Sequence, residues 1–146
     1  TEGIDYSASE LRAELKRLAT QGADVVYDPV GGAWTEIGLR ALALNGRLLI
    51  IGFASGEIPR PPLNVALVKN CDILAVEWAK FAKLEPEQNR VNMSRISRWA
   101  ASNKLATYIH STCDLDDFEP AFMEIAERRA KGKTLLRLHG SFRRQQ

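Results

Sequence analysis

The feature that most constrains the fold is a repeated succession of an apolar strand-like run, a glycine-containing turn and a helical segment. The first run covers 23–28 and is followed by a helical pattern over 33–43. A second run over 47–52 is followed by a short helical segment over 63–68, and a third run covers 72–78. This alternation predicts an α/β fold of the doubly wound class, with the three strands parallel, neighbouring and covered by helices on both faces.

A helix is also expected before the first strand. Ser7 and Glu10 have the S-x-x-E spacing of a capping box at a helix N-terminus. Leucines follow at helical spacing, and Gly22 supplies a stop signal. We therefore expect the chain to enter the first strand from a helix.

The last third of the chain has a different pattern. It predicts a helix over 85–103 and a short strand over 108–112. Asp116 and Glu119 resemble a second capping box that opens another helix, and 133–138 reads as a final strand. These elements form a C-terminal helix-strand extension.

Composition excludes several classes of protein. The longest apolar run, around 48–51, is far shorter than the roughly 20 residues of a membrane helix. The first five residues lack the basic and apolar stretches of a secretory signal. Cys71 and Cys113 are too few for a disulfide framework and are expected to be reduced. We interpret the chain as cytoplasmic, with no membrane partner.

Charge alone does not indicate a polyanionic partner, because 20 basic and 18 acidic residues nearly cancel to a net charge of +2. Basic residues do cluster near the C-terminal end. They either face a phosphate or belong to a solvated helix end and tail. The cluster comprises Arg128, Arg129, Lys131, Lys133, Arg137, Arg143 and Arg144.

Glycine turns follow the first two predicted strands. Residues 28–32, Asp-Pro-Val-Gly-Gly, place a carboxylate, a rigid turn and two glycines after the first strand. Residues 52–56, Gly-Phe-Ala-Ser-Gly, follow the second strand, and Glu77-Trp78-Ala79 marks a third strand end. Each turn alone is compatible with a plain strand-to-helix connection. Neighbouring parallel strands would bring the first two together at the sheet edge where α/β proteins bind ligands.

Several other motifs are incomplete. Residues 132–134 end like a phosphate-binding P-loop but lie between a helix and a strand, in the wrong order. His110, Cys113, Cys71 and His139 lack the spacing of a metal site. Neither a G-x-S-x-G elbow nor a G-x-G-x-x-G fingerprint is present. We therefore expect no metal and no hydrolase chemistry.

The two glycine turns, taken with their flanking strands, resemble the quinone oxidoreductases of the medium-chain dehydrogenase/reductase superfamily, which are zinc-independent and use NADPH. The resemblance extends from just before Tyr6 to about Leu138. The segments that carry it are Ile4-Asp5-Tyr6, residues 23–32, residues 46–56 and Gly132-Lys133.

The resemblance implies that the chain is the C-terminal portion of a longer enzyme. Residues 1–104 would be part of a Rossmann-type domain that lacks its first βαβ unit and its pyrophosphate turn. Residues 105–146 would return to a catalytic domain, so the strand over 133–138 would lack its natural neighbours. The implied activity is hydride transfer from NADPH to a quinone or an α,β-unsaturated carbonyl, and the chain alone is expected to be inactive.

The resemblance also assigns roles to individual residues. Tyr6 matches a position near the adenosine 2′-phosphate of NADPH. Two further groups match positions along the nicotinamide ribose and ring, namely Val30 with Gly31, and Phe53 with Ala54 and Ser55. Trp78 matches a residue near the carboxamide, although Glu77 and Ala79 depart from the family pattern there. Arg129 and Lys133 match positions near the cofactor phosphate and the domain junction, and no catalytic residue is identified.

Other functions fit the same sequence. The chain is expected to form homo-oligomers, and a non-catalytic dimerisation or nucleic-acid-binding module that uses the basic end is one alternative. An enoyl reductase unit of a multidomain synthase is another. Nucleic-acid binding would weaken steeply with salt, whereas a cofactor site would depend on the adenosine 2′-phosphate.

Overall fold

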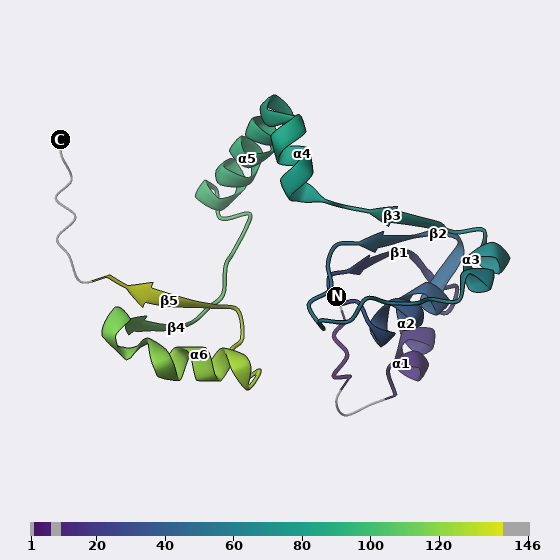
Figure 1. The fold of residues 1–146 in the computed structure, drawn as a ribbon, viewed down its shortest axis with the longest axis horizontal. Coiled ribbons are helices and arrows are strands. Elements are labelled where there is room, and N and C mark those ends of the chain that lie inside the picture. The colour runs from purple at the N-terminus through teal and green to yellow at the C-terminus, as the bar shows by residue number, and fades with distance from the viewer. Residues whose placement is uncertain (1, 7–9, 139–146) are drawn as a thin grey trace. The chain divides into compact units, whose positions relative to one another are not determined.

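The chain forms two compact units, residues 1–84 and 85–146, in a computed structural model that describes residues 2–6 and 10–138 (Figure 1). Each unit contains one parallel sheet. The predicted Rossmann portion, residues 1–104, has a boundary that the family resemblance implies, whereas the boundary after residue 84 reflects compactness. That domain assignment therefore stays a prediction.

The sheet of the first unit has the strand order β1-β2-β3, with all pairs parallel. Tyr27 of β1 pairs with Leu49 of β2, which pairs with Leu74 of β3. The strands are β1 (Ala23–Asp28), β2 (Leu42–Ile50) and β3 (Asp72–Ala75). The predicted α/β class and the adjacency of successive parallel strands are confirmed.

Two helices cover one face of this sheet, namely α2 (Ala33–Ala41) and α3 (Leu63–Lys69). The opposite face carries Val25, Tyr27 and Leu74, whose side chains are exposed. Helices were expected on both faces, but within the described part of the first unit only one face is covered. The core on the covered face comprises Leu39, Leu42 and Leu48, with Val26, Val65, Ala66, Cys71 and Ile73 packed against it.

The first helix, α1 (Leu11–Leu18), begins later than the capping-box prediction requires. Glu10 occupies the N-cap in an extended conformation and makes no side-chain capping hydrogen bond. A capping box would place Glu10 inside the helix, so that prediction is wrong for Glu10, and Ser7 lies outside the described residues. The helix ends before Gly22, which has a φ of +86°.

The ends of β2 and β3 also differ from the prediction. The strand β2 begins at Leu42, directly after α2, and contains an irregularity opposite Ala23 and Val25. The strand β3 ends at Ala75, and Trp78 opens a helix, α4 (Trp78–Leu84), instead of closing a strand. Glu77 explains the change, because its carboxylate accepts a hydrogen bond from the N–H of Lys80 and so caps the first turn.

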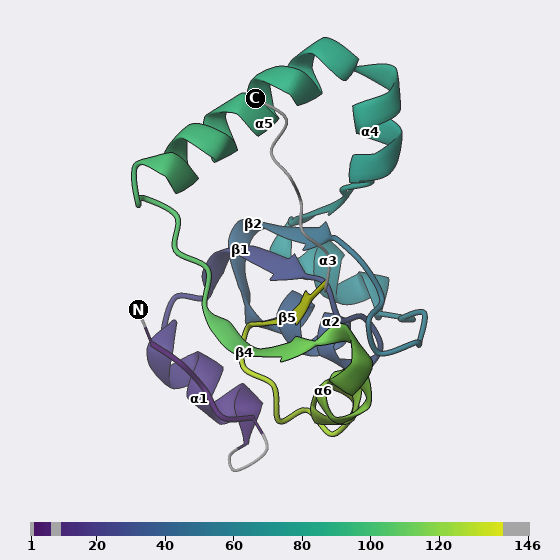
Figure 2. The same ribbon diagram turned by 90° about the vertical axis from the view of Figure 1, so that its left-hand side faces the viewer.

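The second unit contains α5 (Pro86–Ala101), β4 (Ile109–Asp114), a short 3₁₀ helix (Leu115–Asp117), α6 (Phe118–Ala126) and β5 (Lys133–Arg137). In both views α6 lies beside the two strands (Figures 1 and 2). The N-cap of α6 is Asp117, without a side-chain capping bond, so the capping box led by Asp116 is wrong.

The final strand has a partner inside the chain. β5 pairs in parallel with β4, with Thr112 opposite Leu135 and Cys113 opposite Leu136. The expectation that this strand would lack neighbours is therefore wrong for the edge that pairs with β4. A parallel pair joined through α6 forms a local β-α-β unit, because a crossover helix is the usual connection between parallel strands.

No helix among the described residues is both long enough and apolar enough to cross a membrane.

Candidate cofactor-binding site

The site predicted from the glycine turns lies at the carboxyl ends of β1 and β2, and Asp28 is its centre. Asp28 is the last residue of β1 and is 6% exposed. Its Oδ1 accepts hydrogen bonds from the N–H of Val30 at 2.9 Å and of Gly31 at 3.0 Å. Its Oδ2 accepts one from Thr35 Oγ1 at 2.5 Å. One carboxylate thus fixes the turn and joins it to the first turn of α2.

These contacts determine the ionisation of Asp28. Burial acts to raise the pKa of this carboxyl group, but the hydrogen bonds from Gly31, Thr35 and Val30 lower it more. The pKa of Asp28 therefore lies below that of an ordinary aspartate. Hydrogen bonds to a carboxylate favour its charged form, so Asp28 is an anion at neutral pH.

Backbone hydrogen bonds join two loops, residues 29–32 and 51–57, which contain most of the glycine turns predicted over 28–32 and 52–56. The N–H of Ala54 donates to Pro29 O at 3.1 Å, and the N–H of Ser55 donates to Val30 O at 2.9 Å. In the other direction, the N–H of Gly32 donates to Glu57 O at 3.1 Å. The two turns, which are more than 20 residues apart in the sequence, therefore form one layered structure.

Gly31 is required where these loops touch. Its φ is +76°, and an added Cβ would lie 2.8 Å from Cδ1 of Phe53 and 3.0 Å from Glu57 O. A side chain at this position would collide with backbone and with an aromatic ring. The glycine lets the Phe53 loop close over the first turn.

Most of the backbone donors in the loops are already used. The N–H groups of Val30, Gly31, Ala54 and Ser55 all bond within the protein. Among the described residues, the N–H of Phe53 has no acceptor, and Phe53 as a whole is 40% exposed. An apolar ring beside a free amide donor fits a flat heterocycle that carries a carbonyl group, as a nicotinamide does.

Tyr6 packs against a residue that the sequence patterns did not single out. Its ring lies 4.9 Å from that of Trp34, centroid to centroid, at 63°, which is an edge-to-face contact. Trp34 is the second residue of α2 and is 36% exposed, and Tyr6 is 55% exposed. Both rings therefore present accessible surface next to the 29–32 turn.

A cavity of about 250 Å³ lies beside the second loop. Glu36 and Glu57 line it together with Arg60. Arg40 forms an ion pair with Glu36 at 2.8 Å. Two carboxylates in the lining oppose a phosphate, so we assign no phosphate to this cavity.

Trp78 lies beyond the end of β3 and opens α4, with 59% of its surface exposed. The N–H of Val76 still bonds to Ile50 O at 2.9 Å, which continues the strand direction past Ala75. Trp78 is therefore the first residue of α4 and lies two residues after this last sheet contact.

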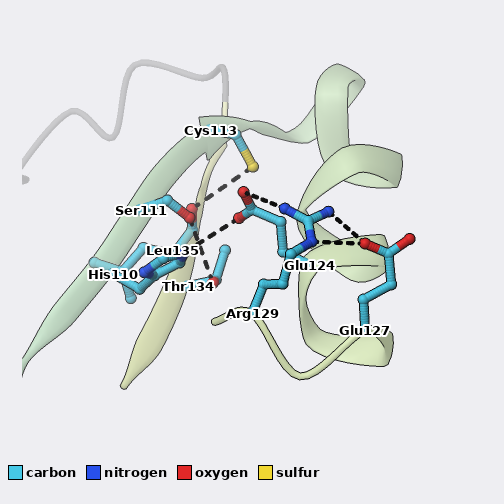
Figure 3. Close-up of polar contacts among 8 residues, drawn as sticks. All are labelled: His110, Ser111, Cys113, Glu124, Glu127, Arg129, Thr134 and Leu135. Carbon is cyan, nitrogen blue, oxygen red and sulfur yellow. Dashed lines mark hydrogen bonds and ion pairs between the residues drawn. The ribbon is translucent and has the colours of Figure 1, made fainter. Parts of the chain in front are cut away.

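Arg129 and Lys133 belong to the second unit, where Arg129 is engaged by acidic residues (Figure 3). Its guanidinium lies 2.6 Å from Oε2 of Glu127 and 3.7 Å from Oε1 of Glu124. Glu124 also lies 3.3 Å from Nε2 of His110. Lys133 opens β5, and its N–H bonds to Tyr108 O at 2.9 Å.

One more member of the basic cluster is also paired. Arg137 lies 3.4 Å from Oδ1 of Asp114, whereas Arg143 and Arg144 lie outside the described residues. Acidic partners reduce the field that Arg129 and Arg137 present to a polyanion.

The family follows from a comparison with known proteins. Residues 1–136 match the family described as zinc-binding dehydrogenase. The chain belongs to this family. Together with its relatives, the match places the chain in the quinone oxidoreductase-like group of the medium-chain dehydrogenase/reductase superfamily, where it corresponds to a C-terminal portion.

Similar proteins of this dehydrogenase family are longer than the chain. A quinone oxidoreductase-like protein 2 homolog of Nematostella vectensis is 34% identical over 138 residues, which cover 93% of this chain and 38% of the relative. The structure of a quinone oxidoreductase of Pseudomonas syringae pv. tomato DC3000 has a TM-score of 0.73 and 27% identity, covering 92% of this chain and 42% of that one. CurA from Vibrio vulnificus, solved in complex with NADPH, has a TM-score of 0.72 and 18% identity, covering 94% and 43%.

The matched family is described as zinc-binding, so we consider whether the described residues of this dehydrogenase chain could hold a metal ion. Among residues 2–6 and 10–138, no group of three or more His, Cys, Asp or Glu side chains is arranged so that it could hold a metal ion. A metal-free site stays a prediction, because it concerns the described residues alone.

Sequence reasoning missed two parts of the site. The carboxylate of Asp28 was noted, but its link to Thr35 was not predicted, although a threonine seven residues later on the next helix is a possible signal. Trp34 was not singled out, because a tryptophan near a helix start is a common packing residue.

Proposed function

We propose that this dehydrogenase chain supplies one wall of the nicotinamide site in an NADPH-dependent oxidoreductase that reduces a quinone or an α,β-unsaturated carbonyl. The observation that carries the proposal is the pair of joined loops at the carboxyl ends of β1 and β2. Open α/β sheets bind their ligands outside these strand ends. Relatives named as quinone oxidoreductases support the reaction class.

Each loop has a part in the proposed site. Phe53 offers its ring and its free N–H to the nicotinamide, while Ala54 and Ser55 hold the loop against Pro29 and Val30. NADPH, when bound, supplies the hydride. The residues here orient the ring and exclude water from one side, since hydride transfer depends on positioning more than on a protein acid or base.

The other cofactor residues have weaker support. Tyr6, extended by Trp34, is proposed to lie along the adenosine part, because both rings are exposed near the start of α2. Trp78 is proposed for the carboxamide side. For Arg129 and Lys133 the proposal rests on the family resemblance, and the ion pairs of Arg129 with Glu124 and Glu127 would have to open before it binds a phosphate.

We further propose that the chain by itself has no NADPH–quinone reductase activity and binds NADPH weakly. Rossmann proteins derive much of their dinucleotide affinity from a glycine-rich turn at a helix N-terminus, and the sequence contains no G-x-G-x-x-G turn. The chain spans 38% of the Nematostella relative, so one wall of a pocket is the largest part we assign to it.

The test combines binding with localisation. The full chain is titrated with NADPH and with NADH by calorimetry and by two-dimensional amide NMR, alongside assays with one quinone and one enone acceptor. We expect weak binding that shifts the amides of Phe53 and Ser55, a preference for NADPH, and no turnover. Phe53→Ala, which removes the ring and keeps the backbone N–H, should weaken the binding and reduce the amide shifts, whereas Leu67→Ala, at an equally apolar and more exposed position on α3, should change neither.

Each outcome addresses a separate part of the proposal. Steady turnover or sub-micromolar binding would contradict the inactivity of the isolated chain. Saturable binding that leaves the amides of residues 53–55 unshifted would contradict the location of the site.

A further inference from the structure

A second cavity, at the opposite ends of the strands, has a lining in which every charged residue is basic. It measures about 350 Å³ and lies where Gly22 precedes β1 and where Leu42 begins β2. Residues of α1, α2 and α3 all contribute to it. The basic residues in its lining are Arg12, Lys16, Arg40 and Lys69.

Two of these cations are already occupied. The ammonium group of Lys69 donates a hydrogen bond to the carbonyl of Leu42. Arg40 forms its ion pair with Glu36, at 2.8 Å. Part of the positive charge also offsets the carbonyl ends of α1 and α2, which terminate here.

The remaining two cations have no partner in the described part of the chain. Arg12 and Lys16 are exposed, lie one turn apart on α1, and form no hydrogen bond or ion pair with any described side chain. Glu14, the acidic residue between them, is engaged by Arg17 at 2.9 Å. The cavity therefore has two cations that an external anion can neutralise.

Apart from Thr20, Gln21 and Gly22, the rest of the lining is apolar. Leu15, Ile37 and Leu42 border the cavity, and Leu42 is 1% exposed. A strongly hydrated inorganic ion gains little from such a surface, whereas a ligand with an apolar body buries it. A lining that combines free cations with apolar side chains fits an amphipathic anion.

We propose that this cavity binds a small organic anion, whose phosphate or carboxylate group contacts Arg12 and Lys16 and whose apolar part rests on Leu15 and Ile37. The site is separate from the proposed cofactor site, because it is formed by the opposite ends of the same strands. Its occupant is a ligand other than the nicotinamide.

The experiment uses the full chain and amide NMR, with hexyl phosphate and hexanoate as anionic probes, hexanol as the neutral probe and inorganic phosphate as the purely ionic one. We expect saturable shifts of the Gly22 and Ala41 amides with one or both organic anions. In the double variant Arg12→Gln/Lys16→Gln, binding should weaken about tenfold, as expected for the loss of two exposed ion pairs. The matched control is Lys80→Gln/Lys83→Gln on α4, which removes two cations away from the cavity.

A response to only one organic anion supports the site and identifies its anionic group. The proposal is overturned if no saturable shift occurs at Gly22 and Ala41, if hexanol or inorganic phosphate binds as tightly, or if both double variants behave alike. The amides of residues 53–55 report the cofactor site in the same spectra, so failure of one site is distinguishable from failure of the other.

Discussion

Phe53 lies directly over Gly31, so that a Cβ at Gly31 would approach Cδ1 of the ring to 2.8 Å. The two residues belong to different strand-end loops, and their contact closes one loop onto the other. The proposed nicotinamide wall depends on this closure, because Phe53 holds the free amide donor.

Gly31→Ala should destabilise the first unit by about 1 to 3 kcal/mol, since a φ of +76° is costly for alanine and the added methyl meets Phe53 and backbone. Urea denaturation followed by tryptophan fluorescence measures this change. Gly3→Ala is the matched control, because a Cβ at Gly3 meets no atom within 4 Å. Equal stability of the two variants would show that the loops are not closed as described.

Asp28→Asn should lower the free energy of unfolding at neutral pH by on the order of 2 kcal/mol, because a buried charged acceptor of three hydrogen bonds is lost. The folded-state pKa of Asp28 is lowered, so its contribution is present above the ordinary aspartate pKa and is lost as the pH falls through the lowered value.

The difference between wild type and Asp28→Asn should therefore shrink as the pH falls below about 4. Denaturation at a series of pH values measures it. The matched control is Asp24→Asn, on the exposed part of the same strand, because its carboxylate accepts none of these three hydrogen bonds. A difference that stays constant into the acid range would exclude the carboxylate of Asp28 as its cause.

The isolated chain should self-associate. The uncovered face of the first sheet exposes Val25, Tyr27 and Leu74, and β1 and β3 leave unpaired edges within the described residues. Light scattering over a wide concentration range measures the mass. Tyr27→Lys should shift the chain towards monomer, whereas Leu67→Lys, 81% exposed on α3, should shift it less. A monodisperse monomer at all concentrations would refute the prediction.

The basic C-terminal end should bind duplex DNA weakly, because Arg129 and Arg137 are paired with Glu124, Glu127 and Asp114. Fluorescence anisotropy with labelled DNA at several salt concentrations is the measurement. Tight binding that falls steeply with salt would favour the nucleic-acid-binding alternative instead.

The local sequence determined that three strands form, where the glycine turns lie and in which order the strands pair, but it did not give the ends of β2 and β3. The run over 23–28 is a strand with those bounds, because β-branched and aromatic residues there favour the extended backbone. The positions of Gly31 and Gly32 also followed from the sequence, since both residues adopt a positive φ. Helix starts were predicted less well, because Glu10 and Asp116 matched a capping pattern that the backbone does not use.

Only the tertiary structure decided which backbone donors, charges and rings of the site are free to contact a ligand. The amides of Ala54 and Ser55 are occupied by carbonyls of another loop, Arg129 is paired with two glutamates, and Tyr6 meets Trp34. The contacts of Ala54, Ser55 and Tyr6 join residues that are more than 20 positions apart in the chain, whereas Arg129 meets its glutamates where the chain turns after α6. Strand and turn preferences arise within a few consecutive residues, whereas the occupancy of a donor or a charge depends on what the fold brings to it.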